Sequence, residues 1–200
     1  RPLMPWPPLR TPITQVNSET ALAVSPGSNL INQCSMALDS RDRPHVAFYA
    51  DDPDGVPQYQ HLWFDGRQWR HHYVSQRTQP FVLAGQGTLQ IPISRPEIVI
   101  DDDDSVYLIH RGDLSGDRMV AQRLAPPHYE PDAAAVRALW PEPLGFAEPV
   151  IDRLRWQRER VLTLQIQKCL QPPNEGAAAP VYEPLRLVDW RLGELFSTGT

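Results

Sequence analysis

Residues Val56–Ser75 read "VPQYQHLWFDGRQWRHHYVS". Two runs rich in apolar and aromatic residues flank Asp65–Gly66, a dipeptide typical of β-hairpin turns. In the first run, Tyr59, His61 and Trp63 occupy every second position, and an amide-rich set lies between them. Because successive side chains of a strand point to opposite faces, the stretch predicts a strand pair with an aromatic and imidazole stripe on one face.

The pattern extends to both sides of this hairpin. Alternating apolar residues and turn-forming Asp, Gly and Pro predict four short antiparallel strands within 31–76, which is typical of one β-propeller blade. A similar phrase returns around Asp101 and Asp152. The sequence therefore predicts an all-β fold, a β-propeller portion of three to four blades: an irregular lead-in (1–30), blades at 31–76 and 93–147, the second with a Pro-rich loop, and a blade or part blade at 148–200.

Three finer expectations follow from the same patterns. Apolar side chains on the hairpin are expected to pack between sheets: Leu62, Phe64, Trp69 and Tyr73. The run "DAAAVRAL" predicts a short helix at Asp132–Leu139. Residues 148–169 are read as strand, turn and strand.

Composition excludes several classes of protein. The 22 prolines among 200 residues argue against a mainly helical chain, and the net charge of −5 argues against non-specific nucleic-acid binding. No apolar run is long enough to span a membrane. Lys168 is the single lysine among 19 basic residues, so any anion site is expected to use arginine, whose planar donors suit carboxylate and sulfate.

The remaining metal and redox signals are weak. Cys34 and Cys169 form neither a disulfide framework nor a zinc motif; each is expected to be a small buried residue, with a single bridge as the alternative. The acidic run Asp101–Asp104 fits a solvated hairpin turn better than a structural calcium site, which stays open as the alternative. No other cofactor is expected.

Three segments resemble the BNR-repeat-containing proteins, which include the propeller-type polysaccharide lyases that cleave ulvan. They are "LINQCSMALDSRDRPHVAFYADDPDGVPQYQHLWFDGRQW" (30–69), "IPISRPEIVID" with "SVYLIHR" (91–111) and "EPVIDRLRWQRERVLTLQIQ" (148–167). The resemblance implies a seven-bladed propeller of about twice this length, of which this chain is similar to the C-terminal half. It also implies secretion or a periplasmic location, although no export signal is present in the chain.

Such a lyase cleaves a uronate polymer by β-elimination. A cation neutralises the carboxylate, a base removes the neighbouring proton, and an acid protonates the leaving oxygen. By resemblance, the candidates for proton transfer are Tyr49 and His61. Arg95, placed in an extended conformation by Pro96, is the candidate for the carboxylate or sulfate, together with Arg10.

Further substrate contacts are expected from Tyr59, whose ring suits a sugar face, and from Asn32 and Gln33, at the start of an inner strand. Four of the candidates also have a structural reading. Tyr49 could brace the adjoining loop, and Tyr59 and His61 could belong to an aromatic layer between sheets. Arg95 could form a structural ion pair with Glu97 or with one of Asp101–Asp104.

The sequence thus predicts binding, and in a complete propeller β-eliminative cleavage, of an acidic polysaccharide. The alternatives are a non-catalytic carbohydrate-binding or scaffold propeller and, more weakly, a sialidase-type hydrolase, for which "DSRDRPH" (39–45) only echoes the expected motif. Expected partners are the polysaccharide, and either N-terminal blades or a second copy of the chain. Neither nucleic acid nor a membrane is expected.

Overall fold

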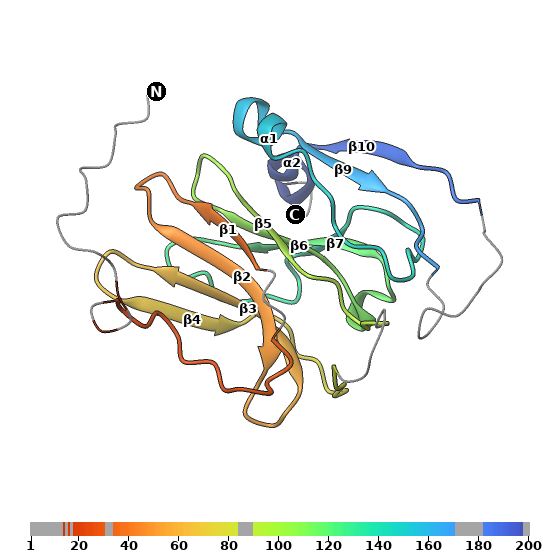
Figure 1. Ribbon diagram of the computed structural model, residues 1–200. Coiled ribbons are helices and arrows are strands. Elements are labelled where there is room, and N and C mark those ends of the chain that lie inside the picture. Colours follow the sequence, from red (N-terminus) through yellow and green to blue (C-terminus); the bar gives the residue numbers. More distant parts are fainter. Residues whose placement is uncertain are drawn as a thin grey trace.

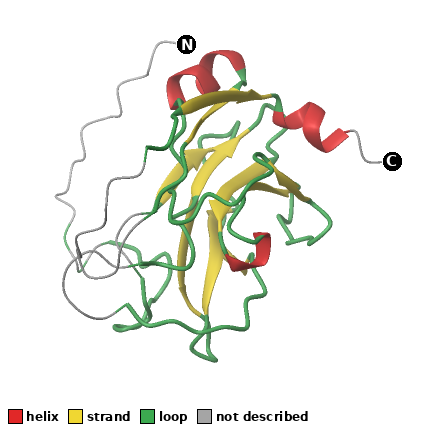
Figure 2. Ribbon diagram, turned by 90° about the vertical axis from the view of Figure 1, so that its right-hand side faces the viewer, coloured by secondary structure: helices red, strands yellow, loops and turns green. Residues whose placement is uncertain are grey.

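The computed structural model describes residues 14, 16, 18–30, 34–83, 90–170 and 182–197. These residues form two four-stranded antiparallel sheets, a two-stranded sheet and short helices (Figures 1 and 2). The first sheet comprises β1 (Ser35–Leu38), β2 (Pro44–Asp51), β3 (Pro57–Phe64) and β4 (Trp69–Tyr73). The second comprises β5 (Glu97–Ile100), β6 (Val106–Arg111), β7 (Met119–Leu124) and β8 (Val136–Ala138). The third comprises β9 (Leu162–Ile166) and β10 (Arg186–Trp190); the helices are η1 (Asp113–Ser115), α1 (Arg153–Glu159) and α2 (Leu192–Ser197).

Each four-stranded sheet is a meander in which every strand pairs with the next one along the chain. The expected hairpin at Asp65 is confirmed: β3 and β4 pair from Phe64 and Trp69 outward. The Asp65 carboxylate accepts the backbone N–H groups of Arg67 and Gln68, at 2.8 and 3.0 Å. These bonds hold the four-residue turn closed.

The sheets stack face to face, as Figure 1 shows. The aromatic stripe of β3 packs with Tyr49 against the second sheet, within one buried cluster that contains Ile98, Val106 and Leu108. The opposite face of the second sheet packs on β9, α1 and α2 through a further cluster that includes Tyr107 and Trp156. Both faces of the second sheet are therefore buried, which is the arrangement expected of successive units in a stack.

The first strands of the two large sheets lie next to each other (Figure 1). Ser35 on β1 donates its hydroxyl to the Glu97 carboxylate at 2.8 Å and accepts the backbone N–H of Ile98 at 3.0 Å. Arg153, at the start of α1, also bonds to Glu97 and to the Ser35 hydroxyl. This polar junction fixes how the inner edges of the two sheets meet.

Two expectations about secondary structure are wrong. Residues 132–139 do not form a helix; they contain a turn and β8, which completes the second sheet. The turn expected within 148–169 is instead α1, whose N-cap Asp152 accepts the backbone N–H of Arg155. A side-chain acceptor at that position satisfies one of the free N–H groups that begin a helix.

Burial also departs from expectation on the outer face of the first sheet. Leu62 is buried as expected, but Phe64 and Trp69 are only half-buried and Tyr73 is 43% exposed. In the described structure, only Ala21 and Leu22 of the lead-in join β-sheet residues in the cluster on this face. The face therefore lacks the full apolar cover that the second sheet receives on both sides.

The expectation for the cysteines is wrong as well. Cys34 and Cys169 are both free and exposed, so neither is a core residue and no bridge joins them. Cys169 instead contributes its backbone: its N–H donates to Leu144, and its carbonyl accepts from Phe146. No helix among the described residues is long and apolar enough to cross a membrane.

Two glycines with the same left-handed backbone provide a matched test of this packing. A Cβ at Gly145 would overlap the backbone carbonyl oxygen of Cys169, whereas at Gly116 the nearest atom is the flexible Arg118 side chain at 3.9 Å. Gly116→Ala should cost about 1 kcal/mol, since left-handed backbone is unfavourable for alanine. Gly145→Ala should cost about 3 kcal/mol, because steric overlap is added. Equal losses in urea unfolding would contradict the close approach at Cys169.

Candidate functional site

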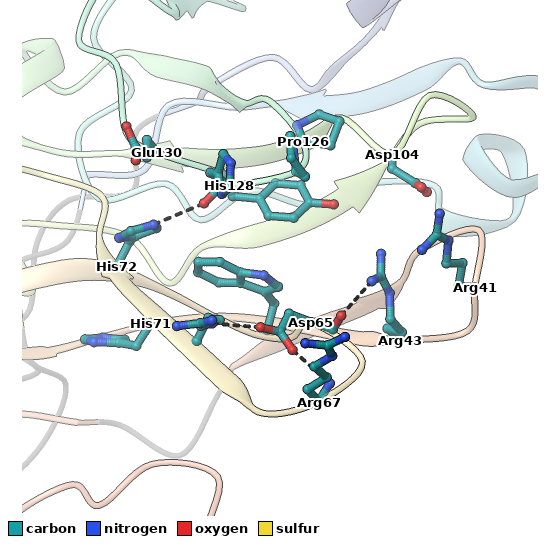
Figure 3. Close-up of a pocket in the computed structure, with 14 residues that line it drawn as sticks. Arg41, Arg43, Asp65, Arg67, His71, His72, Asp104, Pro126, His128 and Glu130 are labelled. Atoms are coloured by element: carbon teal, nitrogen blue, oxygen red, sulfur yellow. Dashed lines mark hydrogen bonds and ion pairs between the residues drawn. The ribbon is translucent and has the colours of Figure 1, made fainter.

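A cleft with a volume of about 720 Å³ lies at one end of the sandwich (Figure 3). Four segments build it: the β1–β2 turn, the β3–β4 hairpin, the β5–β6 turn and the loop that follows β7. Its lining is rich in charged and imidazole groups: Arg41, Arg43, Asp65, Arg67, Arg70, His71, His72, Asp104, His128 and Glu130. Much of this set comes from the Val56–Ser75 stretch, so one end of that hairpin forms a wall of the cleft.

The four arginines of the cleft differ in how they are paired. Arg43 donates to Asp39 at 2.6 Å, and Arg70 donates to Asp65 at 2.7 Å. The hydrogen bond from Arg70 and those from the turn backbone lower the pKa of Asp65 to about 2. The side chains of Arg41 and Arg67 are exposed and form no ion pair or hydrogen bond with any residue that the structure describes. Two guanidinium groups are thus free to bind an anion.

Imidazole groups occupy the other side of the cleft in Figure 3. The Nε2 atom of His72 lies 3.1 Å from the backbone carbonyl of His128, which can only accept a hydrogen bond. His72 therefore carries a proton on Nε2, and in the neutral ring its Nδ1 atom is left as an acceptor. His71 bonds instead to Gln60 at 2.7 Å on the outer face of the sheet.

Trp63 and Tyr129 close the cleft from below. Both side chains are buried, and their ring centroids lie 5.4 Å apart in an edge-to-face arrangement. Burial raises the pKa of the Tyr129 phenol to about 12, so that it keeps its proton at neutral pH. Beneath these two rings lie His45 and His61, whose side chains are fully buried.

His61, a predicted proton-transfer residue, therefore lies under this cleft and does not line it. Its ring stacks on Trp63 with centroids 4.9 Å apart, and the adjacent His45 lies at hydrogen-bond distance. Burial is the main cause that lowers its pKa well below the ordinary value. The arrangement agrees with the aromatic-layer reading of the β3 stripe, and His61 does not contact solvent.

Tyr49 and Tyr59 lie toward the opposite end of the sheets and are each 2% exposed. The Tyr59 hydroxyl lies 2.9 Å from the carbonyl of Ser94 and 2.7 Å from that of Arg111, so it ties the two large sheets together. The Tyr49 hydroxyl is buried and has no hydrogen-bond partner in the described structure. Burial raises the pKa of both phenols. Neither tyrosine is exposed at the surface.

Arg95 is at the same end as Tyr49 and is partly exposed. Its Nε atom lies 3.3 Å from the Glu148 carboxylate, which also accepts the Arg95 backbone N–H at 2.7 Å. Arg95 therefore forms an ion pair, but its partner is Glu148, whereas the sequence suggested Glu97 or one of Asp101–Asp104. Three predicted substrate residues lie outside the described part of the chain: Arg10, Asn32 and Gln33. Those assignments stay predictions.

The acidic run at 101–104 is a hairpin turn whose carboxylates have protein partners. Asp102 accepts from Arg160, Asp103 from Ser105, and Asp104 from Ser40. No group of three or more His, Cys, Asp or Glu side chains that could hold a metal ion is found in the described part of the chain.

Sequence reasoning missed most residues of the cleft. Arg67 and His72 belong to the Val56–Ser75 stretch. Arg67 follows Gly66 in the hairpin turn, which was a usable signal, whereas His72 lies on β4 opposite His61. Tyr129 and His128 lie in the Pro-rich loop, where no periodic pattern marks them. Only the fold brings that loop to the end of the hairpin.

The two buried tyrosines offer a matched test of which hydroxyl stabilises the fold. Tyr59→Phe should lower the free energy of unfolding by about 1–2 kcal/mol, because two buried carbonyl groups lose their donor. Tyr49→Phe should leave it unchanged or raise it slightly, because that buried hydroxyl has no partner to lose. Urea unfolding of both variants measures the difference; a larger loss for Tyr49→Phe would show that its hydroxyl does have a partner.

No curated protein matches the chain. Residues 6–77 match the family model described as "BNR repeat-containing family member". The match takes in all of the first sheet, including the hairpin that contributes Arg67 and His72 to the cleft. A BNR-repeat family domain therefore spans residues 6–77.

Proposed function

We propose that this protein binds an acidic, uronate-containing polysaccharide, and that the cleft at the β3–β4 hairpin is the binding surface. The proposal rests on two guanidinium groups, those of Arg41 and Arg67, which line the same cleft of about 720 Å³. Both are exposed and have no ion-pair partner among the described residues. Arginine forms paired hydrogen bonds with carboxylate and sulfate groups, which recur along such polymers. The imidazole groups of the cleft can donate to and accept from sugar hydroxyl groups.

We further propose that the two four-stranded sheets are consecutive blades of a β-propeller, with β9 and β10 as part of a third. The meander order of the strands, the face-to-face stacking and the neighbouring β1 and β5 all support this arrangement. The thinly covered outer face of the first sheet supports a further blade on that side. A larger assembly of the seven-bladed lyase type is compatible with these features.

Substitution of single arginines tests the binding proposal. Arg67→Ala and Arg41→Ala should each weaken binding of an oligouronate about 10-fold, because each removes a charge-assisted hydrogen bond of about 1.5 kcal/mol. Arg158→Ala is the matched control, since Arg158 is exposed on α1, away from the cleft. Isothermal titration calorimetry gives the dissociation constants.

Arg95→Ala separates the two ends of the molecule in the same experiment. If it weakens binding while Arg67→Ala does not, the ligand lies at the Arg95 end and the cleft assignment fails. No measurable binding of any uronate or sulfated polymer by the wild-type protein would remove the proposal altogether.

A second candidate function, β-eliminative cleavage of the bound polymer, rests on His72. Its bond to the His128 carbonyl leaves Nδ1 as the acceptor that a proton-abstracting base requires. In this scheme Arg67 neutralises the uronate carboxylate, His72 removes the neighbouring proton, and the bond to the leaving oxygen breaks. Tyr129, which keeps its proton at neutral pH, can protonate that oxygen.

Elimination creates a double bond conjugated to the carboxylate, which absorbs in the near ultraviolet. With a catalytic cleft, absorbance should rise on mixing polymer and protein, and His72→Gln should slow that rise by at least 100-fold while binding changes little. Arg158→Ala is the control, because Arg158 is exposed on α1, away from the cleft. No rise with the wild-type protein would leave binding without catalysis.

A further inference from the structure

Two buried histidines lie directly beneath the cleft. The Nδ1 atom of His45 on β2 is 3.0 Å from the Nε2 atom of His61 on β3, and both side chains are fully buried. On the far side, the Nε2 atom of His45 lies 3.7 Å from the Asp39 carboxylate, beyond hydrogen-bond distance, and has no hydrogen-bond partner among the described residues. The Nδ1 atom of His61 is buried and has no hydrogen-bond partner in the described structure.

The carboxylate next to His45 favours one arrangement of the protons in the histidine pair. A carboxylate only accepts hydrogen bonds, so the favourable arrangement puts the His45 proton on Nε2, facing Asp39. His45 Nδ1 then accepts, His61 Nε2 donates, and His61 Nδ1 keeps a bare lone pair. The reverse arrangement would turn a lone pair toward Asp39 and bury an unpaired N–H. The next proton that the pair takes up therefore goes to His61 Nδ1, where no acceptor can stabilise it.

The charged and titratable surroundings offer this extra proton little compensation. The groups that act on the pair are Asp39 at the end of β1, Arg43 in the following turn, His71 and His72 on β4, and Asp104 in the β5–β6 turn. Asp39 already accepts from the Arg43 guanidinium and from the backbone N–H groups of Arg41 and Arg43. Burial lowers the pKa of His45 to about 4 and that of His61 well below the ordinary value.

Tyr129 covers the pair. Its ring meets His45 and His61 edge-on, with centroids 5.0 and 5.5 Å apart, while Trp63 stacks on His61 from the side. Tyr129 has a left-handed backbone conformation, with φ of 54°, which is unfavourable for a bulky residue. One hydrogen bond, from His72 to the His128 carbonyl, joins this loop to the first sheet within the described residues. The Tyr129 ring, which packs on His45, His61 and Trp63, supplies further contacts between this loop and the first sheet.

We propose that His45 and His61 form an acid-sensitive latch: the neutral pair seats the Tyr129 ring and keeps the cleft floor closed, and uptake of a proton releases the ring and opens the floor to water. Linkage fixes the sign. When the floor is open and the pair is hydrated, its pKa should approach the ordinary 6.5; when the floor is closed, the pKa is lower. The closed form is fully stable above pH 6.5 and loses stability as the pH falls toward 4.

The coupling is reciprocal, so it can be measured from either side. If the seated ring lowers the pKa of the pair, protonation weakens the seat by the same factor. The latch regulates the cleft whose ligand is proposed above, but its test needs no ligand. A failure of the latch and a failure of the binding proposal are therefore distinguishable.

The experiment is an NMR titration of the His45 and His61 imidazole signals in the ligand-free protein. In the wild type both should titrate below pH 5.5. Tyr129→Ala should raise the midpoint by at least one pH unit, a coupling of at least tenfold. Tyr182→Ala is the matched control: Tyr182 is exposed and lies outside both four-stranded sheets, so this variant should keep the wild-type midpoint.

If the midpoint in Tyr129→Ala stays within about 0.3 pH units of the wild-type value, the proton affinity changes by no more than about twofold. That result would overturn the latch. So would normal titration of the pair, near pH 6.5, in the wild-type protein. If Tyr129→Ala does not fold, the wild-type backbone signals of His128, Tyr129 and Glu130 decide. They should shift with the same midpoint as the pair, and signals that stay fixed while the pair is protonated would overturn the proposal.

Discussion

The contact between the two large sheets is the constraint on which the rest of the structure depends. Its core is the aromatic stripe of β3, and the Tyr59 hydroxyl locks it by binding the carbonyl groups of Ser94 and Arg111. Burying a hydroxyl without such partners costs free energy, so this contact favours one position of the two sheets relative to each other. With the two sheets held in this way, turns of the first sheet lie beside turns of the second at the end that forms the cleft.

This constraint also determines where function can reside. Residues in the middle of the strands are used for packing, which explains why Tyr49, Tyr59 and His61 are buried despite their reactive groups. The accessible chemistry lies at the sheet ends, where Arg67 and His72 meet the loop after β7. The buried histidine pair joins the two regions, because it belongs to the sheet contact and also supports the cleft floor.

Local patterns predicted the strands well and the site poorly. Alternation and the Asp65–Gly66 turn predicted the β3–β4 hairpin, because its pairing depends on neighbouring residues. The same alternation could not show that both faces of β3 are covered. Asp152, the N-cap of α1, is a residue type that favours a helix start, although the segment was expected to contain a turn between two strands. Tyr129 could not have been placed, since a contact across two sheets leaves no mark in the local sequence.

The most direct test of the account is to map an oligouronate onto the protein by following backbone NMR signals during a titration. We expect the shifts to gather in the four segments that line the cleft, at 41–43, 65–72, 104 and 126–130. Shifts gathered around Arg95 and Glu148 instead would place the ligand at the opposite end of the sheets. That result would contradict the central claim that the hairpin end carries the binding function.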